Sequence, residues 1–348
     1  MVQLAAPVAA VIAIAALCLP LTPPYDLRVF LHAGAAALHG RDFYPRVGTA
    51  SVYSGFSFVY PSLVIAPFLP LAWLPAHLSA TIFFAVSASA VIAASLRLGD
   101  RDSWRVLLVL GTAFTITGLQ LGALSPLLFA AAAFLWLLRG RPLAFASLAA
   151  IAVVSKLFLA PLLVWPLIAR RYRAFALSGT LVVLLLGLGF VLGPLGLSQY
   201  LRLLDALSVH EARAGFGLIS VLRNEGWSPL VAELAAGGLS GALLLGALLH
   251  HRRHGDERLV YCTGVLAALL LSPVVWSHYL ILLLVIPLVL GVSRTWLVVL
   301  ALLSWVIAPP HGLHWELPVP ERLEANGPWL ALITLAGVYV FAASRANP

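Results

Sequence analysis

The residues with the clearest potential for chemistry lie in one polar stretch between two long apolar segments. The stretch runs from Tyr25 to Tyr60 and reads YDLRVFLHAGAAALHGRDFYPRVGTASVYSGFSFVY. Asp26 stands at its start, shortly after the apolar run of residues 4–21. A carboxylate at a boundary between water and lipid can act as a general base that takes a proton from a hydroxyl group. It can also cap the helix that follows by accepting hydrogen bonds from free backbone N–H groups, and the two roles are compatible.

Two further polar residues stand within apolar sequence. Lys156 is the single lysine of the chain and lies between two uncharged runs. An ammonium group there is costly, so Lys156 either snorkels to the interface or contacts a phosphate. His278, in SPVVWSHY, either faces a phosphate or is held beside an interfacial aromatic pair, Trp276 and Tyr279.

Three more residues are candidates for substrate contacts. Gln120 interrupts an apolar segment in GLQLGALSP, where packing and substrate binding explain it equally well. Arg28 lies two residues after Asp26, on a face of the membrane where arginine is disfavoured if the stretch is extracytoplasmic, which suggests an anionic partner. Tyr44 lies in the same stretch, and we include it among the expected substrate contacts.

The elements that must position these residues are membrane helices. The chain has 348 residues, of which 62% are apolar and 10% charged, and its mean hydropathy is +1.01. A soluble fold would have too little polar surface to cover itself. Apolar runs near 20 residues fit helices across a hydrocarbon core of about 30 Å, and the alternating pattern of a membrane barrel is absent. We predict an all-α integral membrane protein, a bundle of roughly 10–13 transmembrane helices.

The apolar runs give the expected spans. Residues 4–21 are predicted to remain as the first span, because no Lys or Arg precedes them and Leu17 before Cys18 is too large for a lipoprotein cleavage site. Pro61–Leu96 is long for one span and contains prolines, so it is either two short helices or one span after a re-entrant piece. The remaining expected spans are 104–119, 121–138, 143–155, 156–169, 174–194, 230–250, 258–272, 279–292, 295–308 and 328–344.

Within the polar stretch, a helical spacing of apolar residues predicts a short amphipathic helix. Leu27, Phe30, Leu31, Gly34 and Leu38 recur at intervals of three and four. Such a helix lies in the membrane interface. We therefore expect an interfacial helix over residues 27–39 in the first outer loop.

Arginine clusters predict the orientation. The formal charge of +8 comes from short loops rich in arginine, which favours membrane orientation over nucleic-acid binding. With these loops in the cytoplasm, Gln120, Lys156 and His278 fall on the opposite face with the loops 195–229 and 309–327, and the loop of about 23–60 joins them if Pro61–Leu96 crosses once. We predict a single transmembrane domain, 1–348. The clusters are Arg170, Arg171 and Arg173; Arg252, Arg253 and Arg258; Arg97, Arg101 and Arg105; and Arg139 and Arg141.

Other motifs are interpreted as structural. The Asp100-Arg101-Asp102 spacing is found in some metal-dependent nucleotide-sugar enzymes, but it falls in an arginine-rich cytoplasmic loop. A histidine group, His250, His251 and His254, lies in a similar basic turn. Cys18 and Cys262 lie in apolar segments and suggest neither a disulfide nor a metal site. We expect no metal and no cofactor, since no phosphate-binding glycine loop, serine elbow or zinc motif is present.

The order of these features resembles a known family. After Asp26 come FSFVYPSLVIAPFLPLAWLP, GLQLGALSP, SKLFLAPLLVWPLIARRYRAF and SPVVWSHY. Together they resemble the GT-C glycosyltransferases of family 87, the bacterial polyprenol-phosphate-mannose-dependent α-mannosyltransferases and their relatives. The family often has Lys-Pro and Gln-x-Asn where this chain has Lys156-Leu157 and Gln120-Leu121-Gly122.

The resemblance implies a function and a mechanism. It implies transfer of a hexose, first of all mannose, from a polyprenyl-phosphate-linked sugar to a lipid or glycan acceptor, on the extracytoplasmic face of a bacterial cytoplasmic membrane, without nucleotide or metal. Asp26 would deprotonate the acceptor hydroxyl, with inversion at the sugar carbon. Lys156, His278 or Arg28 would then stabilise charge on the donor phosphate.

Two other classes of function fit the composition. A transporter or flippase of lipid-linked sugars is the first, although no internal repeat of the kind common in transporters is visible. A noncatalytic membrane protein of envelope assembly is the second, if Asp26 only caps a helix. The loop of residues 196–227 is either an acceptor-binding element or a solvated connector.

Overall fold

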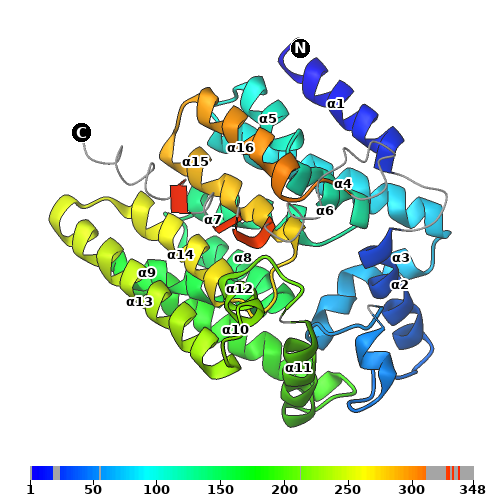
Figure 1. The fold of residues 1–348 in the computed structure, drawn as a ribbon. Coiled ribbons are helices and arrows are strands. Elements are labelled where there is room, and N and C mark those ends of the chain that lie inside the picture. The colour runs from blue at the N-terminus through cyan, green and yellow to red at the C-terminus, as the bar shows by residue number, and fades with distance from the viewer. Residues whose placement is uncertain are drawn as a thin grey trace.

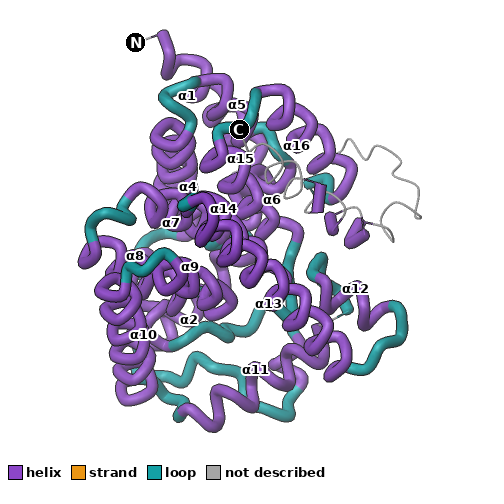
Figure 2. The backbone as a smooth tube through the Cα atoms, turned by 90° about the vertical axis from the view of Figure 1, so that its left-hand side faces the viewer, coloured by secondary structure: helices purple, strands orange, loops and turns teal. Residues whose placement is uncertain are grey.

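The computed structural model describes residues 2–18, 24–54, 56–211, 213–310, 327–329, 331–332 and 336–337. These residues form helices joined by loops and contain no strand, as the colours of Figure 2 show. The all-α prediction is confirmed. The helices, most of them labelled in Figure 1, are α1 (Val2–Cys18), α2 (Tyr25–Leu38), η1 (Ala50–Tyr53), η2 (Ser62–Phe68), α3 (Leu69–Ala72), α4 (Ala76–Leu98), α5 (Ser103–Leu110), α6 (Ala113–Leu121), α7 (Ser125–Leu137), α8 (Pro142–Ser155), η3 (Leu157–Leu163), α9 (Val164–Ile168), α10 (Tyr172–Leu192), α11 (Leu197–Glu211), α12 (Leu218–Asn224), α13 (Pro229–His254), α14 (Glu257–Leu271), η4 (Ser277–Leu284), α15 (Val285–Leu290) and α16 (Arg294–Ile307).

Full-length spans are fewer than the apolar runs suggest. Three described helices, α4, α10 and α13, are long and apolar enough to cross a membrane. A fourth candidate is the pair α5 and α6, which is bent by 63° at the break where the sequence predicts one straight span over 104–119. The break has a local cause: Gly111 ends α5, and the Thr112 side chain accepts a hydrogen bond from the Thr115 N–H at the start of α6. The other apolar segments fold as shorter helices.

Three of these shorter segments share one construction. Each starts as a 3₁₀-helix of seven or eight residues, η2, η3 or η4, and continues as a short α-helix, α3, α9 or α15. Runs of 3₁₀-helix this long are uncommon, because their hydrogen-bond geometry is poorer than that of the α-helix. Each segment also contains proline, which removes a backbone donor. Broken segments of this kind are a feature of membrane proteins that line a cavity.

Pro61–Leu96 resolves into a short piece and a span. The short piece is η2 with α3, and the span is α4, with Trp73, Leu74 and Pro75 between them. The polar stretch thus precedes one full-length crossing, which is the arrangement that brings it to the face of Lys156 and His278. The described part of the predicted first span, residues 4–21, folds as α1 and is one of the shorter apolar helices, whereas most of the loop 309–327 and of the predicted span 328–344 lies outside the described residues.

The predicted amphipathic helix is α2. Leu27, Phe30, Leu31 and Gly34 are buried as the spacing requires, and only Leu38 of the expected apolar face is exposed. The Phe30 ring stacks on the Phe68 ring of η2 with their centroids 4.3 Å apart. This contact fixes α2 against the first broken segment.

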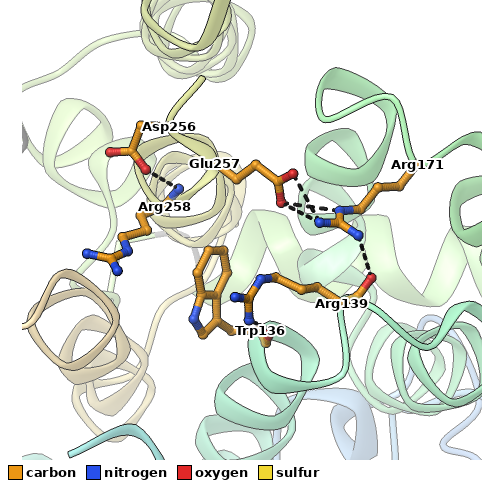
Figure 3. A network of polar contacts seen from close by, with 6 residues as sticks. All are labelled: Trp136, Arg139, Arg171, Asp256, Glu257 and Arg258. Carbon is orange, nitrogen blue, oxygen red and sulfur yellow. Dashed lines mark hydrogen bonds and ion pairs between the residues drawn. The ribbon is translucent and has the colours of Figure 1, made fainter. Parts of the chain in front are cut away.

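Two of the arginine-rich loops meet the start of α14 at one end of the bundle. Figure 3 shows the Arg171 guanidinium donating to both oxygens of Glu257, at 2.9–3.2 Å, and to the backbone carbonyl of Arg139 at 2.8 Å. The Arg139 guanidinium lies over the Trp136 ring, 4.2 Å from its centroid. Three loops are therefore joined here, those before α8, α10 and α14. We call this the arginine end.

Asp102 is also used structurally. Its carboxylate caps α5 by accepting from the Trp104 N–H at 3.0 Å and lies 2.7 Å from Nε of Arg294. Among the described residues, no group of three or more His, Cys, Asp or Glu side chains is placed to hold a metal ion.

Candidate active site

A cavity of about 500 Å³ lies where the polar stretch meets the broken segments. Its wall is built from the start of α2, the end of α6, the start of η3 and the end of α11. Residues from two further segments complete it, Val52, Ser57, Val59 and Tyr60 from the first and Val274, Trp276, Ser277, His278 and Tyr279 from the second. Three of the predicted site residues line it: Asp26, Lys156 and His278. Residues more than 250 positions apart in the sequence thus share one cavity.

Asp26 lies in the first turn of α2. The N-cap of this helix is Pro24, so Asp26 does not occupy the capping position that the sequence left open. A carboxylate in the first turn is still favoured by the helix dipole. Burial raises the pKa of Asp26 from 3.8 to about 6, and the positive charge of Lys156 partly offsets this shift. A carboxylate with a pKa near neutrality is suited to accept a proton.

A close backbone approach holds Asp26 in place. Gly122 ends α6 in the left-handed conformation, with φ of 63°. A Cβ atom added there would lie 2.8 Å from Cβ of Leu27 and 3.0 Å from Cβ of Pro24. Glycine is therefore required both by the backbone conformation and by the contact with the start of α2.

Lys156 stands at the junction of α8 and η3. Its Nζ lies 4.2 Å from the Tyr60 ring centroid and 4.9 Å from the Tyr279 ring centroid. The two rings stabilise the ammonium by cation–π interaction. The lysine is thus held by aromatic rings inside the cavity wall, with its charge available to a ligand.

His278 is close to Asp26 but not hydrogen-bonded to it. Its Nε2 lies 3.9 Å from Oδ2 of Asp26, beyond hydrogen-bonding distance. The imidazole is buried, and Nε2 has no hydrogen-bond partner in the described structure. The Tyr279 ring packs beside it, with the centroids 4.4 Å apart. A buried, unsatisfied ring nitrogen next to the carboxylate is available to a ligand that fills the gap.

The other three predicted residues lie outside the cavity wall. Arg28 is next to it, with its guanidinium 5.1 Å from the Phe56 ring centroid and 5.8 Å from that of Tyr25. Tyr44 is buried behind the wall, where its hydroxyl donates to the Tyr60 carbonyl at 2.6 Å. Gln120 is half-buried in α6, while its neighbour Leu121 lines the cavity. The structure brings together Asp26, Lys156 and His278 and does not add these three.

Glu211 is a second carboxylate in the cavity, and it was only a loop residue in the sequence. It ends α11, whose Tyr200 hydroxyl donates to the Val59 carbonyl at 3.1 Å. Burial raises the pKa of Glu211, with opposing contributions from His210 and Lys156. The sequence signal for Glu211 was its place at the end of an amphipathic stretch. Because Glu211 and Asp26 are 185 residues apart in the sequence, the sequence did not show that they share a cavity. Thr117 and Tyr60 also line the cavity and were not predicted.

The starts of two broken segments line the cavity. Lys156 directly precedes η3, and Ser277 and His278 begin η4. Tyr60, which also lines the cavity, lies two residues before η2. Free backbone N–H groups and the positive ends of helix dipoles lie at such starts. Together with Lys156 they favour an anionic group in this part of the cavity.

The model of glycosyltransferase family 87 matches residues 58–273, more than half of the chain. The chain belongs to glycosyltransferase family 87. The protein is a membrane glycosyltransferase, and it acts on a sugar donor and an acceptor. The matched residues of this glycosyltransferase include Lys156 and Glu211 but neither Asp26 nor His278, so the roles of the latter two rest on the cavity itself. No curated protein and no solved structure matches the chain.

Proposed function

We propose that this glycosyltransferase moves a hexose, with mannose as the first candidate, from a polyprenyl-phosphate donor to a lipid or glycan acceptor. The reaction takes place on the extracytoplasmic face of a bacterial cytoplasmic membrane and inverts the sugar carbon. The observation that carries the proposal is a carboxylate with a pKa of about 6, Asp26, in one cavity with Lys156 and with the starts of the broken segments η3 and η4.

The chemistry needs one base and one anion-stabilising wall. Asp26 accepts the proton of the acceptor hydroxyl as its oxygen bonds to the anomeric carbon. The bond from that carbon to the phosphate oxygen breaks, and its electron pair leaves with the polyprenyl phosphate. Lys156 and the nearby backbone N–H groups stabilise the developing charge on this leaving group. Direct displacement requires no second carboxylate to activate water.

Electrostatics assigns the two ends of the substrate. Asp26 and Glu211 are both carboxylates and repel a phosphate, whereas Lys156 and His278 can donate to one. The donor phosphate therefore belongs beside Lys156, and the hydroxyl groups of the sugar and the acceptor belong beside the carboxylates. His278, whose Nε2 lies 3.9 Å from Oδ2 of Asp26, can donate to substrate oxygens next to that carboxylate.

The test is transfer of radiolabelled mannose from polyprenyl-phosphate mannose to extracted envelope lipids. The wild type and Asp26→Asn are compared in one detergent preparation, with donor binding measured in parallel. Transfer by the wild type only, with donor binding retained by Asp26→Asn, is the expected result. Donor binding without transfer by the wild type would contradict the proposal and would instead support the transporter or the noncatalytic alternative. If the wild type does not bind this donor, polyprenyl-phosphate mannose is the wrong donor.

A further inference from the structure

A second cavity, of about 320 Å³, opens at the arginine end. Four arginines line it, Arg139, Arg170, Arg171 and Arg173, from two consecutive interhelical loops. Arg171 is paired with Glu257. In the described part of the chain, no carboxylate lies within 4.0 Å of the other three guanidinium groups. One carboxylate thus faces four cations. We call this cavity the arginine pocket.

Two helices begin at the arginine pocket. Pro142 starts α8 and Tyr172 starts α10, and both residues line the pocket. Neither helix has an acidic residue in its first turn, and neither N-cap side chain makes a capping hydrogen bond. The positive ends of two helix dipoles therefore face the same space as the arginines, an arrangement that disfavours cations and favours an anion.

The positive-inside trend explains why arginines gather at this end but not why they lie at helix starts. Arg252 and Arg253, by contrast, lie in the last turn of α13, where the dipole favours a cation. Arg105 and Arg294, in another loop, both face Asp102. In the arginine pocket, Arg139 follows the end of α7, and its guanidinium donates to the Trp136 carbonyl at 2.9 Å. Arg170 and Arg173 have no carboxylate within 4.0 Å among the described residues.

The surroundings of the pocket point to a lipid. Leu143, in the first turn of α8, is 66% exposed, and Tyr172 is 59% exposed. The outer face of α10 continues this apolar surface with exposed Val183, Leu184 and Val191. Acyl chains can cover such a face while a headgroup phosphate lies at the helix start, as at basic headgroup sites between membrane helices.

We propose that the arginine pocket binds the phosphate of an anionic phospholipid headgroup. Arg139, Arg170 and Arg173 donate to its oxygens, together with the free backbone N–H groups at the starts of α8 and α10. Arg171 remains paired with Glu257 and holds the loops in position. The site is independent of the sugar-transfer reaction and lies away from the larger cavity.

The test is binding of phosphatidylglycerol to the purified full chain in detergent, followed by native mass spectrometry and thermal denaturation. Phosphatidylcholine and inorganic phosphate are the comparison ligands. The double variant Arg170→Gln/Arg173→Gln is matched by Arg252→Gln/Arg253→Gln, which removes the same charge from a helix end that favours cations. Loss of two charge-assisted hydrogen bonds should weaken phosphatidylglycerol binding by about 10- to 100-fold in the first variant and leave the second near the wild type.

Each outcome decides the proposal. Equal phosphatidylglycerol affinity in the two variants, or equal binding of phosphatidylcholine by the wild type, would overturn it. Equal stabilisation by inorganic phosphate would replace the lipid with a soluble phosphate. Should the first variant fail to fold, arginine modification by phenylglyoxal on the wild type serves instead. Phosphatidylglycerol must then protect Arg170 and Arg173 but not Arg252 and Arg253, and absence of that difference would also overturn the proposal.

Discussion

Asp26 makes the reaction depend on pH in a defined direction. A general base must be ionised, so kcat/KM should fall as the pH drops through about 6 and reach a plateau above it. Asp26→Asn should lower kcat by ~10²–10⁴-fold.

Because the positive charge of Lys156 lowers the pKa of Asp26, Lys156→Met should move the acid limb of the pH–rate profile to higher pH. The pH–rate profiles of the wild type and Lys156→Met check this. Identical acid limbs would show that the limb reports the ionisation of a group other than Asp26.

The same carboxylate should cost stability. Its pKa in the folded protein lies above 3.8, so folding favours the protonated form. The stabilising contribution is complete below pH 3.8 and is lost as the pH rises through about 6, which leaves a cost of up to about 3 kcal/mol at pH 8. Asp26→Asn should therefore raise Tm relative to the wild type at pH 8 and lose that advantage at pH 4. A lower Tm at pH 8 would indicate a structural requirement for the charge.

Glu211 should affect substrate binding more than proton transfer. Its carboxylate accepts hydrogen bonds only, which suits the hydroxyl groups of a sugar. Glu211→Gln should lower kcat/KM by about tenfold, the loss expected for one charged hydrogen bond, while the acid limb near pH 6 remains. Glu225→Gln, an exposed carboxylate of the same loop outside the cavity, is the control. Equal kinetics in both variants would remove Glu211 from the site.

Single residues were more predictable from the sequence than their partners. Asp26, Lys156 and His278 stand out because polar groups in apolar sequence are costly and need a reason. Tyr44 and Gln120 are also polar residues near apolar sequence, but only the folded chain shows that they do not line the cavity. Such exclusion depends on packing, which leaves no local signal in the sequence.

At the scale of elements, the contact between α6 and α2 should control the position of the base. Gly122→Ala introduces strain at positive φ and a Cβ that collides with α2. Gly291→Ala, with φ of 67° and no atom within 4 Å of its added Cβ, introduces the strain alone. Both should lose about 1–2 kcal/mol of stability, and only Gly122→Ala should lose a further 1–3 kcal/mol or so and most of its activity. Thermal denaturation and transfer assays separate them; equal activities would show that α2 tolerates displacement.

Apolar periodicity located the elements but not their interruptions. The boundaries of α2, α8 and α13 follow the predicted runs to within a few residues, because burial and amphipathic spacing determine them. The long 3₁₀ starts of η2, η3 and η4 and the bend between α5 and α6 were not predicted. These interruptions depend on which backbone groups form hydrogen bonds with neighbouring helices. The apolar pattern of a sequence does not specify those partners.

For the whole molecule, the two cavities should face opposite sides of the membrane. α10 begins beside Arg171, and at its other end Gly189 and Gly193 lie against Ser62, next to the larger cavity. In a background without the native cysteines, Ser54→Cys should react with an impermeant reagent from one side of sealed vesicles and Arg253→Cys from the other. Labelling of both from one side would contradict this polarity.

The length of α8 sets how deep the transfer reaction takes place. This helix begins at the arginine end with Pro142, and Lys156 follows its last residue. Its 14 residues rise about 21 Å, while the hydrocarbon core is about 30 Å thick. With Pro142 at the near boundary and α8 along the membrane normal, Lys156 would lie about 9 Å short of the far boundary. A donor whose phosphate reaches this lysine must leave the plane of the surrounding headgroups and descend into the protein, so local thickness of the bilayer should govern how easily the substrate is loaded.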